Sequence, residues 1–307
     1  MRNNFINWLC NKAKIDDRIF LLTADLGYSV LEPFQEKFPN RFLNVGVAEQ
    51  NMVGIASGLA SEGYKPYTYS IGIFPTFRCA EQLRNDIDYH NLGVVTCTVG
   101  SGVAYGSLGY THHAVQDLAL MRSMPNTVIA TPSDPLEVLS ILEWQYENPS
   151  PIYLRMHKAG NKALHNRLPF VQPGKWLSIY DPKELNHKKN ENICVLVIGS
   201  IAPRIKEIVI KTRPEIEIFT IPIWGQKFKE TQFENLNFYK QIIVVEDHLE
   251  DGGFSSWLME CASKKLLDVK INPIALSSNT VGQVAKESTL LEPLFNDFSQ
   301  KIVSIKD

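Results

Sequence analysis

Hydrophobic positions in the first half of the chain follow two alternating patterns. Phe5, Trp8, Leu9 and Ala13 recur at spacings of three or four residues, which is typical of the buried face of a helix. Later apolar runs have the length of strands and lie at residues 19–23, 42–45, 67–73, 93–99 and 127–130. Helical patterns separate them at residues 49–60, 78–88, 114–124 and 135–146. Strands that alternate with helices indicate a parallel sheet with helices on both faces.

A second α/β unit begins after a polar segment. Residues 166–192 are rich in polar, proline and lysine side chains and are predicted to form an interdomain linker. Apolar runs at residues 193–199 and 241–246 then indicate two further buried strands. A chain of 307 residues is long enough for two domains, each with its own core. We therefore expect an α/β protein with two mostly parallel sheets, in domains at residues 1–165 and 193–307.

Composition narrows the possible functions. Hydrophobic residues make up 44% and charged residues 21% of the chain, as in globular proteins, and the formal net charge is −2. That balance gives no electrostatic reason to expect a nucleic acid or an anionic membrane as a partner. The five cysteines include no CxxC pair, the first residues lack the features of a signal peptide, and no apolar run reaches about 18 residues. The expectation is a cytoplasmic protein with free thiols.

Glu49 is the first candidate for chemistry. It follows a predicted strand and Gly46-Val47-Ala48, and it begins a helix of small and apolar residues. Desolvation there would favour a protonated carboxyl group, which could hold or share a proton. The alternative is an acidic residue that the helix dipole favours at a helix N-terminus. The position of Glu49 alone leaves both interpretations open.

A glycine-rich loop is the second candidate. Residues 100–109 lead into His112 and His113, and imidazoles after such a loop suit substrate contacts near neutral pH. Adjacent histidines point in different directions and no acidic cluster has a matching spacing, so a metal site is not expected. The loop also matches no phosphate-binding motif. A polar loop without function is the alternative interpretation.

Several segments match one known family in the same order. The most specific is NVGVAEQNMVGIA at residues 44–56, and residues 79–87, 109–122 and 129–134 follow in register. Over residues 2 to 260 the chain resembles the C-terminal half of a transketolase. Deoxyxylulose-phosphate synthases and the β-chains of 2-oxo acid dehydrogenases are more distant relatives. The resemblance identifies the first domain as a pyrimidine-binding domain and the second as a transketolase C-terminal domain.

The resemblance implies that this chain binds the pyrimidine part of thiamine diphosphate. In the family, the glutamate that matches Glu49 hydrogen-bonds the N1′ atom of the aminopyrimidine and so promotes loss of the C2 proton of the thiazolium. Phe74, or Phe77 if the register shifts, matches the aromatic residue that stacks on the pyrimidine. Arg78 follows as the arginine at the start of the next helix, beside the cofactor. Taken alone, these last three residues would be typical of a protein core.

The resemblance also implies a set of substrate contacts. His112 matches a catalytic histidine that contacts substrate oxygens, and His113 stands where the family usually has glutamine. Asp25 matches an acid at the edge of the active-site cleft. Three further residues match positions that contact the acceptor phosphate, namely Arg2, Ser29 and Arg155. In the C-terminal domain, His248 is expected to be structural.

One half of the expected cofactor site is missing from the sequence. The chain contains no GDG motif with a downstream asparagine, the pattern by which relatives bind Mg²⁺ and the diphosphate. The resemblance therefore implies a separate diphosphate-binding subunit, which holds Mg²⁺ or Ca²⁺. An α2β2 assembly, in which this chain is the β-type subunit, is the simplest arrangement with two whole sites.

Two departures from the family pattern concern the substrate. Leu108 stands where transketolases carry an aspartate that contacts sugar hydroxyls, and Gly100 replaces a phosphate-binding histidine. The expected activity is the transfer of a two-carbon ketol unit between sugar-like substrates, with an acceptor other than ordinary pentose phosphates. The alternatives are a subunit that decarboxylates 2-oxo acids, as in dehydrogenase β-chains or deoxyxylulose-phosphate synthases, and a scaffold without activity.

Overall fold

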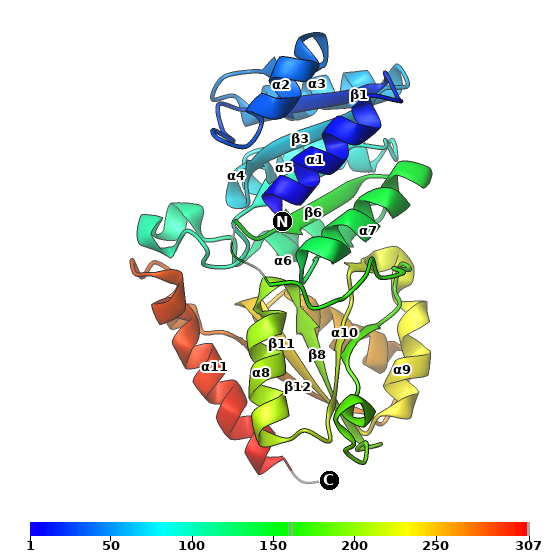
Figure 1. Ribbon diagram of the computed structural model, residues 1–307, viewed down its shortest axis with the longest axis vertical. Coiled ribbons are helices and arrows are strands. Elements are labelled where there is room, and N and C mark those ends of the chain that lie inside the picture. The colour runs from blue at the N-terminus through cyan, green and yellow to red at the C-terminus, as the bar shows by residue number, and fades with distance from the viewer. Residues whose placement is uncertain (159, 161, 306–307) are drawn as a thin grey trace.

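The computed structural model describes residues 1–158, 160 and 162–305, which form two α/β units, one above the other in Figure 1. The sheet of the first unit has seven strands: β1 (Ile19–Thr23), β2 (Phe42–Asn44), β3 (Lys65–Ile71), β4 (Val95–Val99), β5 (Val128–Ala130), β6 (Ile152–Met156) and β10 (Ile223–Trp224). Their order is β10-β5-β6-β4-β3-β1-β2. The edge strand β10 runs antiparallel to β5, whereas the other neighbours pair in parallel.

Helices cover both faces of this first sheet because its strands are apolar on both sides. Leu21 and Leu22, successive residues of β1, belong to different cores on the two faces. One face packs against α1 (Arg2–Ala13), α2 (Glu32–Lys37) and α7 (Pro135–Glu147). The other packs against α3 (Glu49–Ser61), α5 (Ala80–Gln82), the π-helical turn Leu83–Asp88 and α6 (Asp117–Met121), with α4 (Ile73–Phe77) beside them.

The second unit repeats this arrangement with five strands. They are β7 (Leu177–Tyr180), β8 (Ile193–Ile198), β9 (Glu217–Thr220), β11 (Gln241–Leu249) and β12 (Lys270–Leu276), in the order β12-β11-β8-β9-β7. The edge strand β7 is antiparallel and the others are parallel. One face packs against α8 (Ala202–Thr212) and α11 (Glu287–Ser304), and the other against α9 (Phe233–Phe238) and α10 (Phe254–Lys264).

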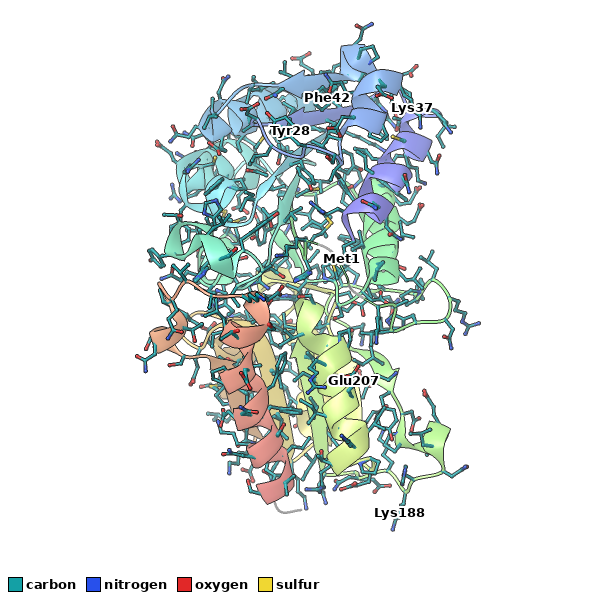
Figure 2. All side chains as sticks on the ribbon, turned by 60° about the vertical axis from the view of Figure 1, so that its left-hand side comes forward. Met1, Tyr28, Lys37, Phe42, Lys188 and Glu207 are labelled. Carbon is teal, nitrogen blue, oxygen red and sulfur yellow. The ribbon has the colours of Figure 1, made fainter. Side chains whose placement is uncertain are left out.

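The two units share one hydrophobic core. The cluster under α3 and α6 continues into the face of the second sheet that α10 covers. Trp224 of β10 makes this connection, because its ring lies 5.0 Å from that of Phe254 and 5.2 Å from that of Trp257, both on α10. Met1 is also buried, and Figure 2 shows it near the junction between the units. The units are therefore packed together through apolar side chains rather than tethered by a linker alone.

The predicted fold class, with two mostly parallel sheets covered by helices, is confirmed. Five strands lie outside the predicted pattern: β6, β9, β12, the two-residue β10, and β7, which falls inside the range predicted as a linker. The helix predicted at residues 78–88 is divided into α5 and a π-helical turn. Every helix in the described part of the chain is too short or too polar to cross a membrane.

Candidate active site

The predicted site residues gather where the parallel strands of the first sheet end. Asp25 follows β1, Glu49 follows β2, Phe74 follows β3 and His112 follows β4. The carboxyl ends of neighbouring parallel strands meet at one edge of a sheet, and ligands of open α/β folds bind beside that edge. The topology therefore brings together residues that are far apart in the sequence.

Glu49 is buried and paired. It begins α3, and its side chain is 5% exposed. Its Oε1 atom accepts a hydrogen bond of 2.7 Å from Nη1 of Arg78, which stands at the C-terminal end of α4 and is about half exposed. The sequence predicted a carboxyl group among apolar side chains, and the structure adds a guanidinium at its side. A ligand N–H group that binds this carboxylate would therefore share it with Arg78.

Phe74 lies between Arg78 and His112. The guanidinium carbon of Arg78 is 4.0 Å from the centre of the Phe74 ring, a cation–π contact. The imidazole of His112 meets the same ring edge-on, with the ring centres 5.1 Å apart. Phe77 lies one helical turn further along α4, and its side chain is 51% exposed. Glu49, Arg78, Phe74 and His112 thus form one continuous cluster, and Phe77 ends the same helix.

The surroundings of His112 favour its neutral form. Burial lowers its pKa below the ordinary value, and the positive charges of Arg78 and His113 act in the same direction. Its Nδ1 atom lies 2.9 Å from the hydroxyl oxygen of Thr111. A neutral imidazole held in this way can accept or donate a hydrogen bond at Nε2, which suits a contact with a hydroxyl or carbonyl oxygen.

His113 and Arg155, for which substrate contacts were predicted, are both buried in this chain, and those contacts stay predictions. The side chain of His113 is 1% exposed, and burial lowers its pKa, an effect that the backbone of Gly106 opposes. Arg155, on the interior strand β6, has its guanidinium buried between the two units. It donates to Asp117 at 2.7 Å, to Asp247 at 2.5 Å and to the carbonyl oxygen of Ala114 at 2.7 Å.

Asp25 and Ser29 shape the turn that follows β1. Both adopt positive φ angles, of 54° and 62°, which non-glycine residues rarely adopt. The hydroxyl of Tyr28 donates to Asp25 at 2.7 Å, and this bond, with a second from Asn44, holds the pKa of Asp25 below its usual value. Figure 2 shows Tyr28 close to Phe42, in the part of the first unit furthest from the second.

Arg2 lies beside two tyrosines at the N-terminal end of α1. Burial raises the pKa of Tyr69, and the charge of Arg2 together with a hydrogen bond from it opposes that rise. Burial likewise raises the pKa of Tyr105, and the same charge opposes it. The ring of Tyr105 lies 6.3 Å from that of His112. Arg2 is thus connected to the cluster around His112 through Tyr105.

A group of three potential metal ligands lies elsewhere in the first unit. Asp134, Glu137 and His165 have ligand atoms within 4.8 Å of one another. The backbone already uses these carboxylates, since Asp134 accepts from Leu136, Glu137, Leu164 and His165 N–H groups, and Glu137 accepts from that of Ser133. Their hydrogen bonds hold residues 164–165 against the start of α7. We interpret this group as structural.

Comparison with known proteins agrees with this geometry. The family described as "Transketolase, pyrimidine binding domain" matches residues 1–162. The chain belongs to the transketolase family. This confirms the resemblance seen in the sequence, and thiamine diphosphate is the cofactor of the family. The strand ends that carry Glu49, Phe74 and His112 all lie within the matched residues.

Individual relatives of this transketolase-family chain differ in length. A subunit of the apulose-4-phosphate transketolase of Actinobacillus succinogenes is 30% identical over 233 residues, which cover 75% of this chain and 72% of that one. A 1-deoxy-D-xylulose-5-phosphate synthase of Clostridium perfringens is 28% identical over 277 residues, but the match spans only 43% of the synthase. A solved structure described as a split gene transketolase, an inactive beta4 tetramer, superposes with a TM-score of 0.81 at 24% identity, over 100% of this chain and 98% of that chain.

The chemistry of the cluster suits an aminopyrimidine. A buried carboxylate can bind a ring nitrogen or its proton, and an aromatic side chain in the same cluster offers a surface for stacking. Sequence reasoning missed two members of the surroundings, Tyr105 and Lys158. Lys158 follows the unpredicted strand β6, so no pattern in the sequence placed it near the loop that leads to His112.

Proposed function

We propose that this chain is the pyrimidine-binding, β-type subunit of a transketolase that transfers a two-carbon ketol unit between sugar-like substrates. The observation that carries the proposal is the buried carboxylate of Glu49, adjoining Phe74 and His112 through Arg78 at the carboxyl edge of the first sheet. The scaffold alternative gives no account of a buried charge there, because a fold retained only for its shape needs no such group.

Each side chain of the cluster has a separate task in this proposal. Glu49 holds or shares a proton with a ring nitrogen of the aminopyrimidine, and Phe74 stacks on the ring. His112, whose pKa is lowered by burial, hydrogen-bonds an oxygen of the sugar near its reacting carbon. Arg78 keeps the carboxylate in place. When bound, thiamine diphosphate supplies the nucleophilic carbon that carries the two-carbon fragment.

The proposal requires a second polypeptide. The diphosphate, with Mg²⁺ or Ca²⁺, would be bound by a separate subunit, because the sequence lacks the metal-binding motif of the family. Two relatives support this division: one is named as a single subunit of a transketolase, and the beta4 tetramer of a split transketolase is described as inactive. We propose an α2β2 assembly with two sites, each built from both kinds of chain.

Calorimetric titration tests this proposal. Mg²⁺–thiamine diphosphate is titrated into the chain alone, into its complex with the candidate diphosphate-binding subunit, and into complexes with Glu49→Gln or, as a control on the exposed end of α3, Glu62→Gln. We expect tight binding only in the complexes, and turnover at least about 100-fold lower with Glu49→Gln alone. Tight binding to the lone chain would show that the diphosphate site is here, and normal turnover of Glu49→Gln would remove Glu49 from the mechanism.

Leu108 provides a test of which acceptor the enzyme uses. Its side chain is 53% exposed on the loop between β4 and α6, at the position where related enzymes carry an aspartate for sugar hydroxyls. We expect Leu108→Asp to raise activity on ordinary pentose phosphates, and Ser107→Asp, one residue earlier on the same turn, to leave it unchanged. Equal use of xylulose and ribose phosphates by the unchanged complex would contradict an unusual acceptor.

A second candidate function follows from the similarity to the synthase. In that case the complex would consume pyruvate and release CO₂. The measurement is CO₂ release from pyruvate in the presence and absence of an aldehyde acceptor. Release at a rate comparable with ketol transfer would make decarboxylation the function.

A further inference from the structure

A cavity of about 860 Å³ lies beside the segment that joins the two units. One wall is formed by residues 164–170, which we call the strap. The other wall belongs to the second unit and consists of β7 and of Lys206 on α8. Among the described residues that line the cavity, none belongs to the cluster around Glu49. The volume is that of a site for a small molecule, since such sites measure about 300 to 1,000 Å³.

The strap is fixed to the first unit near both of its ends. The backbone N–H of Leu164 donates to Oδ2 of Asp134, the cap of α7, at 2.7 Å. Near the other end, the hydroxyl of Ser140 on α7 donates to the carbonyl oxygen of Pro169 at 2.6 Å. Residues 166–168, between these two contacts, are exposed. The strap is therefore a preformed wall of the cavity.

Basic side chains dominate the charge of the cavity. His165, Arg167 and Lys206 line it, and Glu184 is the one acidic side chain among the described lining residues. The amino group of Lys206 donates to the carbonyl oxygen of Ile179, on the outer edge of β7, at 2.5 Å, which uses one of its three donors. Arg167 is exposed and makes no hydrogen bond or ion pair with any residue that the structure describes. Ammonium and guanidinium groups with donors to spare suit a phosphate.

His165 is paired with a buried carboxylate. Its Nε2 atom lies 3.1 Å from Oε1 of Glu137. Burial lowers the pKa of His165, but the hydrogen bond to Glu137 and the charges of Glu137 and Asp134 outweigh this effect and raise it. The charge of Lys206 opposes the rise, so these two basic groups lie near one another. Since Glu137 offsets the charge of His165, the charge offered to a ligand comes from Arg167 and Lys206.

Apolar side chains line the same cavity. The ring of Phe170, at the end of the strap, is 81% exposed, and Leu168 is 50% exposed. Leu177 of β7 adds to this lining from the second unit. An exposed phenyl ring at a cavity offers a face on which a flat ring can stack. A ligand that meets both kinds of wall combines an anionic group with a flat ring, which is the chemistry of a nucleotide.

We propose that this cavity binds a nucleotide, with its phosphates on Arg167 and Lys206 and its base against Phe170. The strap is anchored to the first unit, whereas Lys206 belongs to the second, so a bound nucleotide would bridge the two units. The site shares no described residue with the cluster around Glu49 and has no part in ketol transfer. Its role would be regulation or stabilisation of the enzyme.

Calorimetric titration of the full chain tests the site with ADP, adenosine and inorganic diphosphate. Adenosine lacks the charge of ADP, and diphosphate lacks its ring. The variants are Arg167→Met, Lys206→Met and Phe170→Ala, with Arg204→Met on the exposed surface of α8 as control. Arg167 and Phe170 are exposed, so replacing them should leave the fold intact, which circular dichroism checks. The chain is titrated alone, because a diphosphate-binding subunit would offer a second site.

We expect ADP to bind at least about tenfold more tightly than adenosine or diphosphate. Arg167→Met and Lys206→Met should each weaken the binding of both ADP and diphosphate about tenfold or more. Phe170→Ala should weaken ADP severalfold and leave diphosphate unchanged. ADP should also raise the midpoint of thermal unfolding, because a ligand that binds only the folded state stabilises it. This rise should be lost in Arg167→Met and kept in Arg204→Met.

Three results would overturn the inference. The first is no binding of ADP at about 1 mM. The second is equal affinity for ADP in the unchanged chain, Arg167→Met and Phe170→Ala, because ADP would then bind elsewhere. The third is equal affinity for ADP and diphosphate, which would exclude a contact with the base. None of these measurements uses turnover, so failure of the nucleotide site and failure of the proposed ketol transfer are seen separately.

Discussion

Arg155 is the residue at which the two units of the molecule depend on one another most directly. It donates to Asp117 of the first unit and to Asp247 of the second, and all three side chains are buried. Gly102 lies against the same group, because a Cβ atom there would come within 2.6 Å of Oδ2 of Asp247. The loop that leads to His112 therefore begins directly on this ion cluster.

Arg155→Met should destabilise the protein by about 3 to 5 kcal/mol, because it leaves two buried carboxylates without their cation. The free energy of unfolding, measured with denaturant, checks this value. Arg204→Met on the surface of α8 is the control and should change stability little. A variant of normal stability with a raised KM for a phosphorylated acceptor would return Arg155 to the substrate site.

At the residue scale, the sequence is sufficient to predict the location of residues whose position depends only on the strand that they follow. Glu49, Phe74 and His112 each follow a strand of a parallel sheet, so their common location could be predicted without a structure. The accessibility of Arg155 and of Lys158 could not be predicted from the sequence. It depends on which residue after β6 is the last one buried, and the short segment Ile152–Met156, which itself contains Arg155, carries no signal for that.

Among the elements, strand β11 has the least usual end. Glu246, Asp247 and His248 follow one another and are all buried, although strand residues alternate between faces. Glu246 accepts hydrogen bonds from the backbone of Phe254 and Ser255 and so caps α10. Burial raises the pKa of Glu246 to about 7 and lowers that of His248 to about 4. Lowering the pH therefore stabilises the folded protein through Glu246 and destabilises it through His248.

The sign for Glu246 follows from its raised pKa. Stability from this group is fully present below about pH 4.5, the ordinary value, and is lost as pH rises to about 7. Glu246→Gln should therefore gain stability relative to the unchanged protein across this range, by up to about 3 kcal/mol at pH 7. Denaturant unfolding from pH 4.5 to 7.5 measures the difference, with exposed Glu250→Gln as control. Parallel stability curves would contradict the assignment.

For His248 the sign is reversed. Its contribution is present above about pH 6.5 and is lost as pH falls towards about 4, because the unfolded chain then binds a proton that the buried ring excludes. In the Glu246→Gln variant, the opposite pH dependence of Glu246 is absent and no longer offsets the contribution of His248. The stability of that variant should therefore rise with pH between about 4.5 and 6.5.

Two of the strands that the sequence did not reveal have no clear pattern of their own. The strand β10 has two residues, and β7 is a four-residue edge strand inside a polar segment. Both are strands because of their partners: Ile223 pairs with Ala130, and Leu177 pairs with Thr220. Long apolar segments such as β8 and β11 were predicted because burial on both faces makes them apolar throughout.

At the scale of the whole molecule, the two halves of the chain depend on one another. The first sheet takes its edge strand β10 from the second half of the chain, and both units contribute to one hydrophobic cluster. A fragment of residues 1–176 would lack Trp224 of β10 and the Asp247 partner of Arg155. We expect this fragment to show no cooperative thermal transition, whereas the full chain should show one. Circular dichroism and calorimetry measure both. Cooperative unfolding of the fragment would mean that the first unit folds without its seventh strand.

The position of β10 also limits how such a polypeptide could be divided in evolution or by a protease. A cut between β6 and β7 would yield two pieces, each of which lacks something that the other holds. The first piece would lack its edge strand β10, and the second would lack the strand β5, with which β10 and its Trp224 pair. Gene fission at that point would have to be followed by reassociation of the pieces, much as in complementing enzyme fragments.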